Sequence, residues 1–227
     1  MRSIATPIAQ HLAVVTKALQ LIADQLVIMR GSRVIIDSLS FAVGGGEALV
    51  LAGANGAGKT TLLRAVAGFL PAEHGSIRLD PNQDDAGLRE RMHVIGHTNG
   101  IKASLTVREN IMFWSSYLSE DDGSEARRRA DRALDHFGLI ELEDFPAQYL
   151  SAGQKRRLGL ARLLAAYRPV WLLDEPTVSL DTASVAQLAD AVNSHTQAGG
   201  IVIAATHVPL GLDRARELRL APAGPPQ

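Results

Sequence analysis

The chain contains no cysteine, carries almost no net charge and has no long apolar run. The lack of cysteine excludes disulfides, thiolate metal ligands and cysteine nucleophiles, and it is compatible with a reducing compartment. A net charge of −1 gives no indication of nucleic acid or of an anionic membrane as a partner, so we expect no nucleic-acid binding. No apolar run reaches the roughly 18 residues that would indicate a membrane-spanning helix.

The two ends of the chain differ in composition from the part between them. In the stretch 1–18, a proline and polar residues at positions 7–11 interrupt the apolar residues, so we do not interpret it as a signal peptide. We expect a poorly ordered leader there, with a weak amphipathic contact segment as the alternative. Proline and glycine in 219–227 predict a disordered tail. The remainder, 19–218, has the length of a single domain.

Apolar patterning between these ends predicts an α/β fold. Alternation over residues 20–43 favours two antiparallel strands around a turn at 30–32. The runs EALVLAG, VWLLDE and GIVIAATH are short and continuously apolar, as in buried parallel strands. The segment from about 98 to 168 is mainly helical in pattern. We therefore predict a mainly parallel core sheet flanked by helices, an N-terminal antiparallel β subdomain and an α-helical subdomain.

The stretch GANGAGKTT matches the phosphate-loop pattern G-x-x-x-x-G-K-[ST]. Its glycines let backbone amides turn towards phosphate oxygens. Lys59 is expected to reach the β- and γ-phosphates, Thr60 to bind Mg²⁺ and Thr61 to add a phosphate contact. A glycine-rich turn that binds nothing is the alternative, but the motif lies between a predicted strand and a predicted helix. The predicted ATP phosphate-binding residues are Gly53, Ala54, Asn55, Gly56, Ala57, Gly58, Lys59, Thr60 and Thr61.

Two acidic residues and a histidine follow predicted buried strands. Asp174 ends the run VWLLD, at the strand end where ligands gather in open α/β sheets, and is expected to orient Mg²⁺ through water. Glu175 follows it and is the candidate general base. Two acidic residues that only cap a helix before a proline are the alternative. His207 ends the strand that we expect beside Asp174, where it could hold the attacking water, although a lone histidine at a strand end is usually structural.

A second turn suited to an anion occurs in LSAGQKRRLGLARLL, residues 150–164. Serine, alanine and glycine precede a helix start that is rich in lysine and arginine, and helix N-termini bind anions. The chain already has a phosphate loop about a hundred residues earlier. The residues alone leave open why one protein would carry two such turns.

Taken together, these motifs resemble those of the ATP-binding subunits of ABC transporters. The phosphate loop, the signature LSAGQ, the strand ending in Asp174–Glu175, the D-loop SLD and the switch His207 occur in the family's order, and the resemblance covers about 19–212. It implies hydrolysis of ATP between two copies stacked head to tail, with Asp181 reaching across the seam. The residues that it implies grip ATP in trans are Ser151, Ala152, Gly153 and Gln154.

Three positions depart from the family pattern. Ala152 replaces a glycine of the signature. His97 stands where the Q-loop glutamine is expected, so we include it among the catalytic candidates and as a possible water-mediated metal contact. Arg30 stands where an aromatic residue usually stacks on adenine. A guanidinium plane can also stack on a base, and a disordered Arg30 is the alternative.

The stretches GHTNGIKASLTVREN, LSAGQKRRLGLARLL and ATHVPL narrow the resemblance to the ATP-binding subunit of the haem exporter used in cytochrome c maturation. That resemblance implies a peripheral location on the cytoplasmic face of the bacterial inner membrane, a separate permease and haem-handling membrane proteins. The coupled step could be haem export or release of a haem chaperone. A soluble ABC-type ATPase of DNA repair or translation, and a nucleotide-binding regulator without hydrolysis, are the competing functions.

The predicted helix TVRENIMFWSSYL places Ile111, Trp114 and Tyr117 at helical spacing. Such stripes usually pack against a core. A groove that receives a helix of the permease is the alternative.

Overall fold

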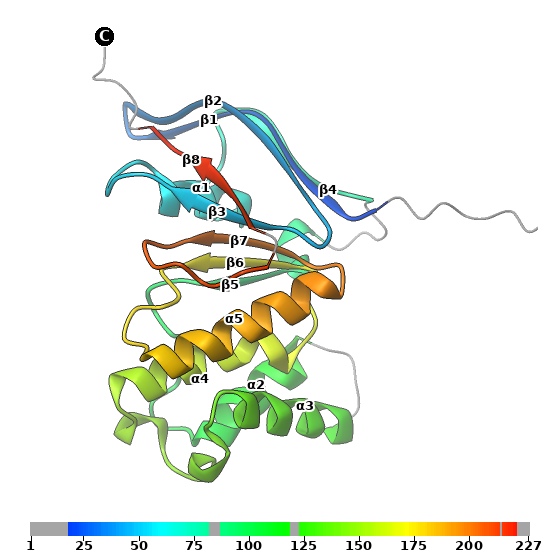
Figure 1. Ribbon diagram of the computed structural model, residues 1–227, viewed down its shortest axis with the longest axis vertical. Helices are drawn as coiled ribbons and strands as arrows, with labels where there is room; N and C mark the ends of the chain where they lie inside the picture. The colour runs from blue at the N-terminus through cyan, green and yellow to red at the C-terminus, as the bar shows by residue number, and fades with distance from the viewer. Residues whose placement is uncertain (1–17, 82–86, 119–122, 214, 222–227) are drawn as a thin grey trace, which may run out of the picture.

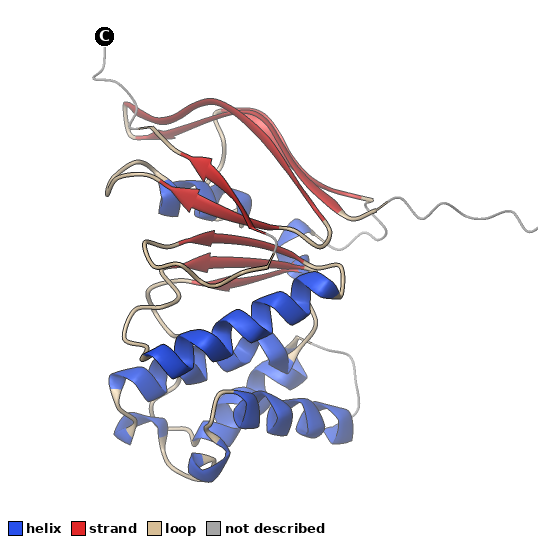
Figure 2. Cartoon of the chain, in the orientation of Figure 1, coloured by secondary structure: helices blue, strands red, loops and turns tan. Residues whose placement is uncertain are grey.

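The computed structural model describes residues 18–81, 87–118, 123–213 and 215–221. The predicted leader, apart from its last residue, and most of the predicted tail lie outside the described residues. The elements form three layers, with an antiparallel sheet on one side, a parallel sheet in the middle and helices on the other side (Figure 1). Figure 2 separates these strand and helix layers by colour. This arrangement confirms the predicted α/β class.

The antiparallel layer has the strand order β2-β1-β4. Its strands are β1 (Gln20–Arg30), β2 (Arg33–Gly44) and β4 (His74–Asp80). The hairpin closes where predicted, because Gly31 adopts a positive φ of 62° in the turn. Arg30 and Arg33 are directly paired at the end of the hairpin.

The parallel layer has the strand order β5-β6-β7-β3-β8 within the described residues. Its strands are β3 (Ala48–Ala52), β5 (Met92–Ile95), β6 (Val170–Asp174), β7 (Ile201–Ala205) and β8 (Ala215–Arg219). All neighbouring pairs are parallel, so the carboxyl ends of these strands meet at one edge. The edge strand β8 was not predicted. It continues to Arg219 and is followed by the buried Leu220.

Helices cover the other faces of the sheets, and those within about 98–168 form the predicted helical subdomain. The helices are α1 (Lys59–Val66), α2 (Val107–Tyr117), α3 (Gly123–His136), α4 (Ala152–Ala165) and α5 (Thr182–Gln197), with 3-10 turns at Leu88–Arg91, Ile140–Leu142 and Ala147–Tyr149. Thr106 and Glu109 form a capping box at the start of α2. Ile111 on that helix is buried, whereas Tyr117 is 72% exposed, so the predicted stripe packs inward only in part.

The strand β6 separates two hydrophobic cores, because its side chains alternate between the faces of the sheet. Trp171 and Leu173 belong to the core shared with the helical subdomain and α5. Val170 and Leu172 belong to the core beneath the antiparallel sheet, together with most of α1. The end of β6, which carries Asp174, is therefore fixed from both sides.

Across the part of the chain that the structure describes, none of the helices combines the length and apolar character that a membrane crossing requires.

Candidate functional site

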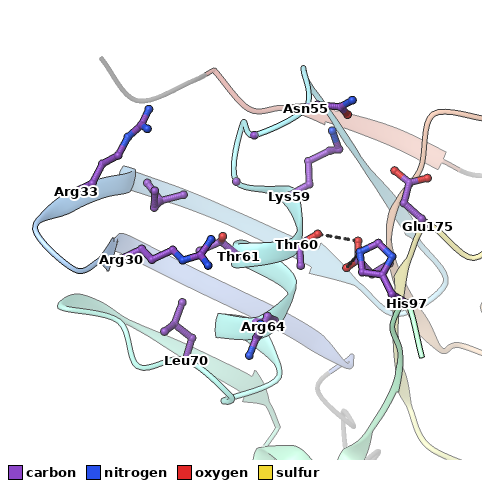
Figure 3. Close-up of a pocket in the computed structure, with 14 residues that line it drawn as sticks. Arg30, Arg33, Asn55, Lys59, Thr60, Thr61, Arg64, Leu70, His97 and Glu175 are labelled. Atoms are coloured by element: carbon purple, nitrogen blue, oxygen red, sulfur yellow. Dashed lines mark hydrogen bonds and ion pairs between the residues drawn. The ribbon is translucent and has the colours of Figure 1, made fainter. Parts of the chain in front are cut away.

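A cavity of about 800 Å³ opens at the carboxyl edge of the parallel sheet. The phosphate loop and α1 form its floor, the β1–β2 hairpin forms one end, and residues after β5 and β6 form the other (Figure 3). This edge is where ligands bind in open α/β folds. The residues lining it are Arg30, Arg33, Ile35, Asn55, Gly56, Gly58, Lys59, Thr60, Thr61, Arg64, Leu70, His97, Asp174 and Glu175.

The phosphate loop requires glycine at the positions where the backbone is left-handed or closely packed. Gly53 has a φ of 141°, and a Cβ there would lie 2.6 Å from the carbonyl oxygen of Leu220. Gly58 has a φ of 98°, and a Cβ there would lie 2.9 Å from the side chain of Ile35. Gly58 is also the N-cap of α1 and provides no side-chain cap. The first amides of α1 are therefore left to bind an anion in the cavity.

Lys59 is largely buried, and its ammonium lies inside the phosphate loop. The Nζ atom donates to the carbonyl oxygens of Gly53 at 2.7 Å and Ala54 at 3.2 Å. An ammonium has three donors, so one remains for an oxygen in the cavity. The loop thereby presents a fixed positive charge next to the N-terminus of α1.

Thr60 and Asp174 meet although they are 114 positions apart in the sequence. The Oγ1 atom of Thr60 donates to Oδ1 of Asp174 at 3.0 Å, and Nε2 of His97 lies 3.6 Å from Oδ2 of the same carboxylate. Asp174 is buried and shares its two oxygens between the two neighbours. A hydroxyl and a carboxylate are hard oxygen donors, which suit Mg²⁺ with water and phosphate as its other ligands.

Glu175 and His207 lie together at the edge of the same cavity. Strand pairing explains their proximity, because Asp174 on β6 lies opposite Ala205 on β7. Nε2 of His207 is 3.5 Å from Oε1 of Glu175 and 3.1 Å from Oδ1 of Asn55 in the phosphate loop. Glu175 has a φ of 46°, which is rare for a residue other than glycine. Its amide is held by the carbonyl of Ala205 at 2.8 Å.

The end of the cavity at the β1–β2 hairpin is cationic. Arg30 lines it, and Figure 3 shows its side chain running from the hairpin towards Thr61. Arg33 and Arg64 line the same end but were not predicted. Neither residue belongs to a recognised sequence motif, although the tight hairpin pairs Arg30 directly with Arg33.

The signature residues adopt a helix start outside this cavity. Ser151 is the N-cap of α4, and its Oγ atom accepts a hydrogen bond from the amide of Gln154 at 3.2 Å. The side chain of Gln154 accepts one from the amide of Ser151 at 2.8 Å, which completes a capping box. Ser151 and Ala152 are exposed. No residue of Ser151–Gln154 lines the 800 Å³ cavity among the described residues.

The signature and the D-loop lie side by side. A Cβ on Gly153 would lie 3.0 Å from the carbonyl oxygen of Ser179, so only glycine fits there without a shift. Asp181 is the N-cap of α5 and accepts from the amide of Ser184 at 2.8 Å. Hydrogen bonds from Ser184 hold the pKa of the Asp181 carboxyl below its ordinary value.

Comparisons with known proteins agree with this geometry. Residues 36–178 match the family model described as "ABC transporter". Two similar proteins are both named cytochrome c biogenesis ATP-binding export protein CcmA. The one from Agrobacterium fabrum is 48% identical, over 89% of this chain and 95% of its own length. The one from Rhodobacter capsulatus is 48% identical, over 91% of each chain.

A solved structure of similar fold is that of cbiO1 from Clostridium perfringens, described as part of the ABC transporter complex cbiONQ. It is 28% identical to this chain, with a TM-score of 0.74, and the alignment covers 88% of this chain and 86% of that one.

Proposed function

This chain belongs to the ABC transporter family as an ATP-hydrolysing subunit, and from that premise we propose that two copies bind ATP between them to drive a membrane permease. The observation that carries this proposal is the meeting of Thr60, Asp174, Glu175 and His207 around one phosphate loop. They come from three separate motifs, since Asp174 and Glu175 are adjacent at the end of β6, and together they supply the groups that hydrolysis of a triphosphate needs.

Within one copy, we assign the following roles. The phosphate loop and Lys59 bind the phosphates. Thr60 directly, and Asp174 and His97 through water, would hold Mg²⁺, which would supply positive charge next to the β- and γ-phosphates. Glu175 accepts a proton from the water that attacks the γ-phosphorus. The bond from phosphorus to the β–γ bridging oxygen breaks, which gives ADP and phosphate, and His207 orients the attacking water.

The Glu175→Gln variant tests the general base. The amide keeps the size of the side chain but cannot accept the proton, so we expect turnover to fall by a factor on the order of 10² to 10⁴. Affinity for a fluorescent ATP analogue should stay within about twofold, because the phosphate loop is untouched. Glu217→Gln on the exposed face of β8 is the matched control. Unchanged turnover in Glu175→Gln would refute the assignment.

We propose that the signature acts on the ATP bound by the other copy. Ser151 and Ala152 are exposed at the N-terminus of α4, and neither lines the cavity formed by the chain's own phosphate loop. A helix N-terminus with a serine cap attracts an anion. In a head-to-tail dimer, Ser151, Ala152, Gly153 and Gln154 contact the γ-phosphate of the facing copy, and Asp181 lies at the same seam.

Two variants of Ser151 separate this role from helix capping. Aspartate is as good an N-cap as serine, but its carboxylate would face the γ-phosphate. Two unit charges 4 Å apart interact by about 4 kcal/mol at an effective dielectric constant of 20, which corresponds to roughly a thousandfold weaker dimer. Alanine removes the cap without adding charge. We therefore expect Ser151→Asp to impair ATP-dependent dimerisation and turnover more than Ser151→Ala does.

Sedimentation velocity with ATP, in a Glu175→Gln background, measures this dimer. ATP affinity of the monomer should be the same in both Ser151 variants, because the signature does not touch the ATP of its own copy. A loss of monomer affinity that matches the loss of dimer would instead place the signature in cis.

We propose that Arg30 holds the adenine ring. The cavity has no aromatic side chain at its hairpin end within the described residues, and Arg30 extends into it. A guanidinium plane stacks on a base and also attracts its electron-rich ring atoms.

The transport process is inferred from family members whose sequences are 48% identical to this chain. Like the proteins named cytochrome c biogenesis ATP-binding export protein, the chain serves cytochrome c biogenesis. We propose that it binds a separate permease and haem-handling membrane proteins at the cytoplasmic face of the bacterial inner membrane. Haem export and release of a haem chaperone are both compatible with this site, because substrate contacts would lie in the permease. Co-purification from membranes, combined with loss of haem-linked cytochromes on deletion, tests the assignment.

A further inference from the structure

Arg156 is a buried arginine between the signature and the catalytic loops. It lies on α4 two positions after Gln154, and only 4% of its surface is exposed. A buried charge is costly unless its surroundings satisfy it. The guanidinium has five N–H donors in a fixed plane. All the hydrogen bonds that it donates within the described residues go to backbone carbonyls or to an amide oxygen.

One side of the guanidinium binds the loop that follows β5. Its Nη1 atom donates to the carbonyl oxygen of Gly96 at 2.8 Å and to Oδ1 of Asn99 at 3.0 Å. These two residues flank His97, which approaches Asp174. Arg156 therefore holds this loop on both sides of the predicted Q-loop residue.

The other side binds the loop that follows β6. The Nε atom donates to the carbonyl of Pro176 at 3.0 Å, and Nη2 donates to that of Glu175 at 2.7 Å, with a long contact of 3.5 Å to that of Asp174. These bonds fix the backbone from which the Glu175 carboxylate projects. Glu175 adopts a left-handed conformation that is rare for its residue type. The hydrogen bonds from Arg156 stabilise this unfavourable backbone conformation.

The same face of α4 packs against the loop after β5 and against β5 itself at the next two turns. Gly159 lies so close to Asn99 that a Cβ would be 3.0 Å from the Cβ of Asn99. Arg162 donates to the carbonyl of Val94 in β5 at 3.0 Å, with its guanidinium over the Trp114 ring at 4.6 Å. Positions 156, 159 and 162 share one helix face. The helix that begins with the signature is therefore attached to β5 and to the His97 loop that follows it.

We propose that Arg156 is a positioning residue that sets the spacing between the His97 loop and the Glu175 loop and ties both to the signature helix. The inference rests on the proposed function, in which His97 and Glu175 act on the ATP of their own copy and the signature acts on the ATP of the partner. Arg156 makes these two sets of groups move as one body. A single plane with donors on both edges can bridge two loops. A lysine ammonium has three donors but only one nitrogen, which cannot lie at both edges at once.

Arg156→Lys tests the bridge while keeping the positive charge. We expect kcat to fall by about tenfold or more, because a small misplacement of catalytic groups is enough to lose that factor. KM for ATP and the affinity of the resting monomer should change by no more than about threefold. Amide hydrogen exchange should become faster in residues 96–100 and 175–178, with other segments unchanged.

Arg157→Lys is the matched control, since Arg157 is the adjacent residue on the same helix and also donates to backbone carbonyls. Its Nη1 atom binds Phe137 at 2.8 Å and Gly138 at 3.3 Å, both in the helical subdomain and neither in a catalytic loop. We expect its kcat to stay within about twofold of the unmodified chain, and exchange in the two loops to be unaffected.

Asn99→Ala removes one of the bonds without burying a new charge, so it keeps the inference testable if Arg156→Lys does not fold. We expect a fall in kcat of about threefold to fivefold at unchanged KM. Wild-type turnover in either variant would overturn the inference, and so would exchange that rises throughout the chain along with the loss of turnover. If Glu175→Gln retains full turnover, the general-base assignment within the proposed function fails. If Glu175→Gln is inactive but Arg156→Lys is not, only the role of Arg156 fails.

Discussion

Two buried histidines should make the fold sensitive to mild acid. His93 on β5 is 5% exposed and His195 on α5 is 7% exposed. Burial lowers the pKa of His93 from 6.5 to about 4, partly offset by its hydrogen bond with the carbonyl of Ala166. Burial also lowers the pKa of His195 to about 4, and hydrogen bonds to the backbone of Pro169 and Ile201 oppose the effect. Both rings are therefore kept neutral by the folded state.

The size of the effect follows from these pKa values. The unfolded chain takes up protons on these rings below pH 6.5, whereas the folded chain does so only near pH 4. Their contribution to stability is therefore fully present above pH 6.5 and is lost as the pH falls towards 4. Between pH 7 and pH 5, each histidine lowers the free energy of unfolding by about 2 kcal/mol, and the pair by about 4 kcal/mol. That is a large part of the 5–15 kcal/mol typical of a domain.

Urea unfolding at pH 7 and pH 5 measures this difference. His93→Gln keeps a donor for Ala166, and His195→Phe keeps the ring stacked on Trp171, whose centroid lies 3.9 Å from that of His195. Each variant should remove about 2 kcal/mol of the pH-dependent loss, whatever its stability at pH 7. His74→Gln on the exposed face of β4 is the control. A pH difference that stays the same in both variants would refute the reasoning.

Three further substitutions test separate parts of the site and its support. Thr60→Val removes the hydroxyl that bonds Asp174, so we expect half-maximal turnover to need about tenfold more Mg²⁺ in a titration. Arg30→Ala should raise the Kd of ATP about threefold to tenfold but leave that of inorganic triphosphate unchanged, which calorimetry would show. Gly200→Ala places a Cβ 2.2 Å from the His195 ring, and we expect a loss of about 1–3 kcal/mol in urea unfolding at pH 7.

The elements that the sequence predicted well are those with strong local signals. The phosphate loop, the end of β6 and the cap of α2 each depend on a few adjacent residues whose chemistry indicates one conformation. The continuous apolar runs predicted the buried parallel strands equally well. Their meeting at one edge follows from the rule for parallel sheets, which is why the sequence predicts that Thr60 and Asp174 share one site.

The features that the sequence did not predict depend on tertiary contacts. The strand β8 has the pattern ARELR, which is polar because it forms an exposed edge. Arg33 and Arg64 resemble ordinary surface arginines until the hairpin and α1, respectively, place them beside the cavity. Arg156 belongs to a basic run, and only its burial against two distant loops distinguishes it from Arg157.

The strand β8 brings the end of the described chain to the back of the phosphate loop. The amide of Leu220 binds the carbonyl of Ala52 at 2.8 Å, and its own carbonyl leaves no room for a side chain on Gly53. A label attached at Ala221 would therefore lie close to the phosphate loop. Truncation of the chain before Leu220 would remove these contacts and loosen the phosphate loop, although every sequence motif would remain.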